Sequence, residues 1–432
     1  MITTFLKRDD ILQKETIAKN ISLSHLKATH FKTNRITVQF LMDLCPQKLS
    51  ETTIVPFLLT RNSAKYFTFK ELSKKLANLY GASLYFDVEK YGDILSIQIS
   101  ASSIDQKFTL NGEDTLSEAA ELLCEAIFNP LVKDGKFDEN LLENEKRLLI
   151  ERIENEINEK RSYALNKTFE KMCDGEPFAA FKYGTIEQAK AISPASAFNA
   201  WKNMLEKSRV EIIVSSSGEI SNISEKFRTA FSKVDRENYT LSDTIIRSAN
   251  APKEESETMD ISQAKLVLAM RANIDFKSEE TTAAVLFADI FGGGAYSKLF
   301  KNVREKMSLC YYCSARYIRL KGIITVDCGV DVNNIELAKS AILKDFEAVK
   351  KGEISNEEIS AAKAGIVNRL AGLYDKQEVL EGWYLSQSLD SLAVSPDEFA
   401  KELEAVTVEQ IANVAKKFEL DTTFTLLPKE GE

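Results

Sequence analysis

Residues 291–311 read Phe291-Gly-Gly-Gly-Ala-Tyr-Ser-Lys-Leu-Phe-Lys-Asn-Val-Arg304-Glu-Lys-Met-Ser-Leu-Cys-Tyr311. The segments on both sides of the three glycines have helical patterns, so the run predicts two helices joined by a sharp turn, with a strand from Tyr311. Parts of the run recur 227 residues earlier, where Leu72-Ser-Lys-Lys-Leu corresponds to Leu299-Phe-Lys-Asn-Val and Tyr85 corresponds to Tyr312. The sequence therefore contains an internal repeat.

Both copies of the repeat predict the same order of elements: a strand, a helix, a hairpin, an apolar helix and a long helix. These fall at 36–44, 69–80, 82–102, 116–128 and 137–157 in the first copy. In the second they fall at 264–271, 278–291 with 296–306 (two helices around the three glycines), 311–331, 335–349 and 355–374. Each half closes with a helix and a strand. The pattern predicts an α+β fold of two tandem, homologous α/β-sandwich domains, each a mainly antiparallel sheet packed by helices.

The segment 235–258 is polar and rich in Ser, Asn and Glu, which is typical of a flexible linker. It predicts an N-terminal domain at 1–234 and a C-terminal domain at 259–432. Two similar halves joined in this way can face each other across a cleft.

Composition excludes several classes of protein. The 432-residue chain has 65 acidic and 56 basic residues, a net charge of −9, and no long Lys/Arg run, so a nucleic-acid-binding protein is not expected. No stretch approaches 18 apolar residues, so no membrane span is expected. The first ten residues lack the apolar core of a signal peptide, and we therefore expect a cytoplasmic protein.

The six cysteines are scattered along the chain, and reduced thiols are expected. The one C-x-x-C, Cys310-Tyr-Tyr-Cys313, lies in a strand-like run where positions i and i+3 point to opposite faces, so it predicts neither a zinc site nor a redox pair. The two histidines, His25 and His30, lack carboxylates at metal-site spacing and are expected to be partly exposed strand residues. The charged segment 143–161 predicts a solvated helix face.

The run 291–311 resembles a signature of the M16 (pitrilysin-like, processing-peptidase) family: a Gly-rich turn, Ser-Arg/Lys-Leu-Phe, and then Arg-Glu-Lys-x-Gly-Leu-x-Tyr. The tandem halves fit that family over almost the whole chain. Ser308, where the family usually has Gly, and Lys298, where Arg is common, are two departures. Within the family the chain is most similar to the inactive YfmF-type members of Gram-positive bacteria, whose label associates them with elongation-factor-P modification.

The family's inverted zinc motif, His-x-x-Glu-His, falls on Thr53-Ile-Val-Pro56-Phe57. Thr53 and Phe57 take the places of the two histidine ligands and Pro56 that of the general base, and none of these side chains binds zinc or activates a water. The resemblance thus implies that this chain holds no metal or other cofactor, carries no catalytic residue and does not hydrolyse peptides alone. A Glu-rich helix at 139–159 covers the region of the third ligand.

The resemblance implies that Arg304 and Tyr311 bind substrate, because the corresponding side chains project toward bound peptide. A guanidinium can donate to a peptide carbonyl, and a phenol can donate to an oxyanion. From the residues alone, the pair also fits a surface helix end followed by a core tyrosine. Gly292, Gly293 and Gly294 are not followed by Lys-Ser/Thr, so they predict a turn and not a phosphate loop; the resemblance makes them secondary substrate contacts.

These expectations combine into a leading hypothesis: a non-catalytic subunit of a heterodimeric M16-type zinc metallopeptidase. This chain would supply Arg304, Tyr311 and half of the peptide chamber, and a zinc-bearing partner with His-x-x-Glu-His would supply the metal, water and base. An alternative is a structural, assembly or peptide-binding scaffold without a proteolytic role. A third is a binding module for a translation factor or its modifying enzyme. A homodimer is also compatible with the sequence.

Overall fold

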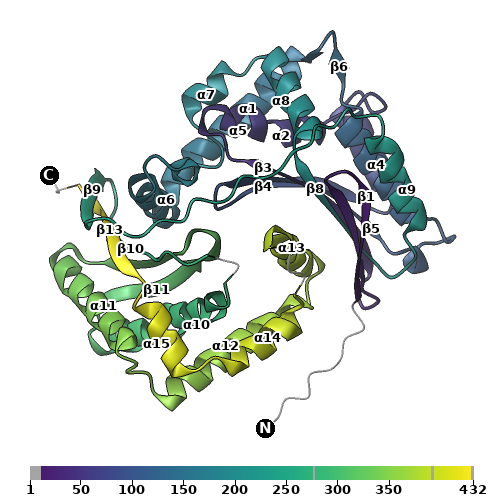
Figure 1. The fold of residues 1–432 in the computed structure, drawn as a ribbon. Helices are drawn as coiled ribbons and strands as arrows, with labels where there is room; N and C mark the ends of the chain where they lie inside the picture. The colour runs from purple at the N-terminus through teal and green to yellow at the C-terminus, as the bar shows by residue number, and fades with distance from the viewer. Residues whose placement is uncertain (1–10, 276–277, 391–393, 430–432) are drawn as a thin grey trace. The chain divides into compact units, whose positions relative to one another are not determined.

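The structure, a computed structural model, describes residues 11–275, 278–390 and 394–429 (Figure 1). These residues form two compact units, and neither unit is continuous in sequence. Unit 1 comprises the described residues of Met1–Glu154, Lys182–Asp243 and Lys376–Ser391, and unit 2 those of Asn155–Phe181, Thr244–Asp375 and Leu392–Glu432. No helix in the described ranges is long and apolar enough to cross a membrane.

Unit 1 is built on a six-stranded sheet in the order β1-β2-β8-β3-β5-β4. Every neighbouring pair is antiparallel except β2–β8, which is parallel. The strands are β1 (Ile11–Ala18), β2 (Ile21–Lys27), β3 (Thr33–Asp43), β4 (Ser83–Tyr91), β5 (Ile94–Ile104) and β8 (Arg209–Ser216). A small hairpin, β6 (Val132–Lys133) and β7 (Lys136–Phe137), stands apart from this sheet.

Helices cover the apolar face of this sheet, because alternate residues of β3, such as Ile36, Val38 and Phe40, are fully buried and form a core. Helices α4, α8 and α9 contact the sheet (Figure 1). The helices of the first half are α1 (Leu49–Thr53), α2 (Val55–Leu59), α3 (Phe69–Asn78), α4 (Thr115–Phe128), α5 (Glu139–Asn158), α6 (Lys160–Met172), α7 (Ile186–Ala191), α8 (Pro194–Glu206) and α9 (Ser221–Phe231). The capping box predicted at the start of α3, Thr68 with Glu71, is present.

Unit 2 repeats the sheet with one strand fewer, in the order β9-β13-β10-β12-β11, again with one parallel pair, β9–β13. Its strands are β9 (Lys253–Met259), β10 (Ala264–Arg271), β11 (Cys310–Ile318), β12 (Ile323–Val330) and β13 (Glu419–Pro428). The helices of the second half are α10 (Glu280–Gly292), a π-helical segment (Phe300–Lys306), α11 (Ile335–Lys350), α12 (Asn356–Leu373), α13 (Gln377–Gln387), α14 (Pro396–Ala405) and α15 (Val408–Ala415). Strand by strand, this order matches β2-β8-β3-β5-β4 of unit 1, so the predicted repeat and α+β class are confirmed.

Each unit contains one helix from the other half of the sequence. Helix α13 belongs to unit 1 and contacts β3 and β8, whereas α6 belongs to unit 2 and contacts β10 and β13. Because β3 and β8 correspond to β10 and β13, the two helices occupy equivalent places. The boundaries predicted at 234 and 259 divide the chain into its two repeats. The compact units differ from the repeats because each includes a segment of the other half of the sequence.

Buried ion pairs attach the exchanged segment 155–181 to unit 2. The Glu176 carboxylate lies 2.6 Å from Lys321 Nζ and 2.7 Å from Arg271 Nη2, and all three side chains are at most 2% exposed. Burial alone would raise the pKa of Glu176, but the two cations hold it below its usual range. On the surface of the same unit, Arg161 forms a bidentate pair with Asp327 at 2.5 and 3.0 Å.

The predicted linker is ordered over much of its length. The Tyr239 hydroxyl accepts a hydrogen bond from Asp43 N at 2.7 Å, and Ser242 donates to the Asp43 carboxylate from both N and Oγ, at 2.8 and 2.9 Å. Arg236 donates to the carbonyl oxygens of Leu205 and Ser208. The last predicted linker residues form most of β9. Polar side chains of 235–258 thus bond the fold at several points, and its assignment as the linker between the halves stays a prediction.

Candidate functional site

The π-helical segment and β11 of unit 2 carry the predicted substrate-binding residues. The Arg304 side chain is 38% exposed, its guanidinium carbon lies 4.4 Å from the centre of the Phe300 ring, and its Nε lies 3.8 Å from Glu305 Oε1. Tyr311 is 81% exposed, so the alternative interpretation as a core tyrosine is wrong. Both side chains are accessible to a ligand.

A β-bulge explains why Tyr311 points away from the sheet. In the ladder between β11 and β12, Cys310 pairs with Val330 and Tyr312 with Gly329, so Tyr311 is the extra residue. Within unit 2, β11 is an edge strand whose partner among the described strands is β12. Its outer edge offers backbone groups to an added strand.

The two departures from the family signature have structural explanations. Ser308 adopts φ 52°, the left-handed region in which glycine is free of strain, so a Gly is the natural residue there. Lys298 is 9% exposed, and its Nζ lies 3.0 and 3.1 Å from the two carboxylate oxygens of Glu358, the capping residue of α12. Lys298 therefore fixes α12 to this part of unit 2.

The three glycines differ in their surroundings: Gly292 is buried, whereas Gly293 is exposed. Gly292 is the last residue of α10, and a Cβ added to it would lie 2.4 Å from Ala315 N on β11. A Cβ on Gly293 would lie 2.3 Å from Asp289 Oδ1. Gly293 N donates to Asp289 O, as expected for a helix end, so this amide does not contribute to an anion cradle. Gly294 is partly exposed.

The bulge also brings cysteines together, contrary to the expectation for Cys310 and Cys313. Their thiols hydrogen-bond each other, and Cys313 also bonds Cys328, its cross-strand partner on β12. The extra residue shifts the alternation, so that positions 310 and 313 share a face. The hydrogen bond from Cys313 lowers the pKa of Cys310, and the Arg304 charge adds to this effect. None of the six cysteines, which all lie in the described ranges, forms a disulfide bond.

The degenerate zinc-motif positions lie in unit 1, in α1 and α2, and all three side chains are buried. Thr53 Oγ1 donates to Leu49 O at 2.8 Å, which satisfies its hydroxyl within the helix. Phe57 is 2% exposed, and its ring centre lies 4.5 Å from that of Phe86 and 6.4 Å from that of Tyr183. Pro56 offers no donor atom. In the described ranges, no group of three or more His, Cys, Asp or Glu side chains could hold a metal ion.

A cation stands beside Phe57. The guanidinium of Arg152, on α5, lies over the rings of Phe57, Phe86 and Tyr183, with its Cζ 4.9, 5.3 and 5.7 Å from the ring centres. Arg152 Nη1 also donates to Tyr183 Oη at 2.9 Å. Arg152 lies within the segment 143–161, whose charge pattern predicts a solvated helix face and gives no sign of this aromatic contact.

The histidines do not form a second site. His25, on β2, is 5% exposed rather than partly exposed, its Nε2 lies 3.1 Å from Ser216 Oγ, and burial lowers its pKa. His30 lies in the turn after β2 and is exposed.

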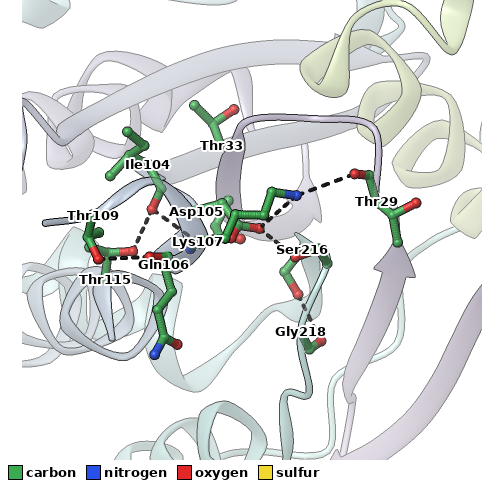
Figure 2. Close-up of polar contacts among 12 residues, drawn as sticks. Thr29, Thr33, Ile104, Asp105, Gln106, Lys107, Thr109, Thr115, Ser216 and Gly218 are labelled. Carbon is green, nitrogen blue, oxygen red and sulfur yellow. Dashed lines mark hydrogen bonds and ion pairs between the residues drawn. The ribbon is translucent and has the colours of Figure 1, made fainter. Parts of the chain in front are cut away.

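The polar groups near Ser216 stabilise loops. Figure 2 shows the loop after β5: Lys107 Nζ lies 3.8 Å from Asp105 Oδ2 and donates to Thr29 O, while Thr115 Oγ1 donates to Ile104 O at 2.5 Å. The adjoining hollow, about 620 Å³, is thus lined by groups that already bond one another.

A larger hollow of about 1030 Å³ lies on the helical face of unit 1. Two of its lysines are paired with acids: Lys75 contacts Glu118 and Lys226 contacts Glu121, each at 2.5 Å. The hollow presents no concentrated charge, and no predicted site residue lines it.

Comparison with known proteins confirms the resemblance inferred from the sequence. Residues 191–366 match the family model described as the peptidase M16 inactive domain. A Bacillus subtilis protein named "Probable inactive metalloprotease YmfF" is 27% identical over 406 residues, which cover 94% of this chain and 95% of that protein. Its designation is YmfF, which corrects the YfmF of the sequence analysis.

Solved structures show the same fold. A conserved protein from Enterococcus faecalis V583 superimposes with a TM-score of 0.89 at 28% identity, covering 98% of this chain and all of that one. The periplasmic protease PqqL from Escherichia coli gives a TM-score of 0.70 at 14% identity, covering 99% of this chain but 48% of its own.

Proposed function

Since this chain carries a peptidase M16 inactive domain and has the two-domain fold of M16-like peptidases, we propose that it is the non-catalytic subunit of an M16-type zinc metallopeptidase. The zinc-bearing chain, with an intact His-x-x-Glu-His, is its partner. The present chain contributes Arg304, Tyr311 and part of the peptide-binding surface. We place the complex in the cytoplasm, where cysteines remain reduced, since none of the six cysteines in the described ranges forms a disulfide bond.

One observation carries this proposal: Tyr311 is exposed on a bulge of an open edge strand, and the half-exposed Arg304 lies near enough to Cys310, the preceding residue, to lower its pKa. An exposed tyrosine side chain is well suited to bind a ligand, because its ring can bury apolar surface against the ligand and its hydroxyl can form a hydrogen bond. An extended peptide can pair with the β11 edge through its main chain and present carbonyls to Arg304.

The positions of unit 1 on which the family's zinc motif falls lack metal-binding side chains. Thr53, Pro56 and Phe57 offer neither zinc ligands nor a base, and Arg152 places a positive charge against Phe57. A cation there opposes the binding of another cation. The zinc, the water and the base therefore have to come from another chain.

Solved structures with this fold include chains that it covers completely, such as a protease from Helicobacter pylori, and longer chains. In PqqL, the fold of the present chain accounts for 48% of the molecule. A protein with this fold can therefore be half of a larger enzyme, and we infer that here the second half is a separate polypeptide.

The test is zinc content and peptide cleavage of the purified chain, alone and mixed with an M16 chain that has the zinc motif. We expect no stoichiometric zinc and no cleavage by this chain alone, and cleavage in the mixture. Arg304→Ala or Tyr311→Ala should lower kcat/KM about 100-fold, the effect of losing one oxyanion or carbonyl donor. Arg147→Ala, at an exposed arginine paired with Glu151 on α5, is the control and should leave the rate unchanged.

Two results would contradict the proposal. Chelator-sensitive cleavage by this chain alone would mean that it holds a metal. If both variants bind the partner and support full activity, the chain is a scaffold with no substrate-binding role. Retention of a translation factor in place of a peptidase would favour the third hypothesis.

A further inference from the structure

Arg152 is an exposed cation that is held in place without being neutralised. Its guanidinium packs on three aromatic rings and donates one hydrogen bond, to Tyr183 Oη. Among the described residues it forms no ion pair, although the chain has a net charge of −9 and nearby arginines such as Arg61 and Arg147 are paired with glutamates. A guanidinium has five N–H donors, so most of those of Arg152 are available to a ligand.

The aromatic platform is rigid. Phe57 and Tyr183 are 2% and 5% exposed, and their rings meet at 78°, while Phe57 also packs against Phe86. Stacking on these rings fixes the plane of the guanidinium, and the bond to Tyr183 fixes its rotation. A pre-oriented guanidinium loses little side-chain entropy when it binds a planar, bidentate anion, and a carboxylate has that shape.

The platform lies at the edge of the unit 1 sheet. Phe86 is on β4, and the partner of β4 among the described strands is β5, so one side of β4 has open backbone groups. A second cation, Lys182, lies 5.5 Å from the Tyr183 ring, but its Nζ is 2.8 Å from Glu89 Oε1 and is therefore already paired. Arg152 therefore brings to this edge a positive charge that no ion pair in the described part of the chain neutralises.

We infer that Arg152, on its platform of Phe57, Phe86 and Tyr183, binds the C-terminal carboxylate of an extended peptide. The peptide main chain pairs along β4 and ends at the guanidinium. Phe57 occupies a position where the family resemblance places a zinc ligand, so a fixed organic cation and its N–H donors replace a metal ion there. The site recognises a peptide end instead of cleaving a peptide bond.

This inference does not depend on the proposed function. It concerns unit 1 alone, needs no partner chain, and does not involve Arg304 or Tyr311. If the mixture with a zinc-bearing chain does not cleave peptides, the Arg152 site is unaffected. If Arg152 does not bind a carboxylate, the proposed two-chain peptidase is unaffected.

The experiment measures binding of a hexapeptide of alternating Val and Thr, labelled at its N-terminus with an uncharged dye, by fluorescence anisotropy. The peptide is made with a free C-terminal carboxylate and as the C-terminal amide. We expect the free acid to bind at least 10-fold more tightly than the amide. Raising NaCl from about 50 to 500 mM should weaken binding of the free acid and leave the affinity for the amide nearly unchanged, because salt screens an exposed ion pair.

Three variants assign the effect to one side chain. Arg152→Gln should abolish the difference between acid and amide, and Arg152→Lys should retain part of it, since it keeps the charge but not the bidentate geometry. Arg147→Gln, one and a half turns earlier on the same helix, should change nothing. Thermal unfolding of each variant establishes that it is folded. If Arg152→Gln is not folded, the inference is tested on the unsubstituted protein by comparing its binding of the acid and the amide at low and high salt.

An amidated peptide with one internal Glu distinguishes the source of the carboxylate. If it binds as tightly as the free acid and loses affinity in Arg152→Gln, the site is a carboxylate site that takes acidic side chains. Equal binding of the acid and the plain amide would overturn the inference, as would an equal loss of affinity in Arg147→Gln.

Discussion

At the scale of single residues, a substitution of Gly292 can distinguish a role in packing from a role in substrate contact. The close approach of its Cα to Ala315 N leaves no room for a Cβ, whereas Gly372, near the end of α12, has no atom within 4 Å of an added Cβ. Both positions lie in helices and neither has a positive φ. The pair is therefore a matched test of the turn that was predicted from the triple glycine.

Gly292→Ala should lower the free energy of unfolding by about 1–3 kcal/mol, because α10 or β11 has to move. Gly372→Ala should raise it by up to about 1 kcal/mol, the helix-propensity difference between Gly and Ala. Urea denaturation measures both. A Gly292→Ala protein that keeps its stability and loses only peptide binding would show that the glycine contacts substrate.

At the scale of elements, α13 is held to unit 1 by a buried carboxyl group. Glu381 is 1% exposed, and it accepts hydrogen bonds from Arg35 Nε at 2.6 Å and Thr37 Oγ1 at 2.9 Å. Burial raises its pKa to about 7, with Arg35 opposing the rise. The other titratable groups near it are Tyr85 on β4 and Glu378 on α13.

The raised pKa predicts a pH-dependent stability with a definite sign. Between pH 5 and pH 7 the unfolded chain has released the Glu381 proton and the folded protein retains it, so stability from this group falls as pH rises, by about 2–3 kcal/mol. Glu381→Gln should remove that part of the slope. Urea unfolding of both proteins at pH 5 and pH 8 measures it, and equal slopes would show that Glu381 does not titrate in this range.

Local features of the sequence predicted much of each sheet. The β10 bounds, both hairpins and the capping boxes of α3 and α12 follow from alternation and from hydrogen bonds between residues three apart, which are properties of short segments. The exchange of α6 and α13 was not predicted, because an amphipathic pattern shows that one helix face is buried without showing which sheet covers it.

The candidate site was predictable in part. The residue types of Arg304 and Tyr311 identified the region through the family resemblance, but the exposure of Tyr311 and the meeting of Cys310 with Cys313 depend on a bulge, and the sequence has no clear signal for it. Arg152 could not be singled out from the sequence, because it lies among many other charged residues of the same helix. Its role depends on three aromatic residues that are distant in sequence, and no local pattern joins them.

For the whole molecule, the exchange makes each unit depend on both halves of the chain. Residues 1–243 lack α13 and would leave Arg35 without Glu381, and they carry α6 without the strands that it covers. We expect residues 1–243 or 244–432 expressed alone to aggregate or to unfold without cooperativity, and the two fragments expressed together to form a stable complex. Size-exclusion chromatography and thermal unfolding test this; a cooperative, monomeric 1–243 fragment would contradict it.

The same exchange sets the timing of folding during synthesis. The last segment of unit 1 is made after residue 375, whereas the strands that α13 contacts are complete by Ser216. At ribosomal rates of roughly 5–20 residues per second, the gap between Asp243 and Lys376 takes about 7–27 seconds. Throughout that interval the part of the sheet that α13 contacts is uncovered in the nascent chain, so we expect the yield of folded protein to depend on translation speed and chaperones.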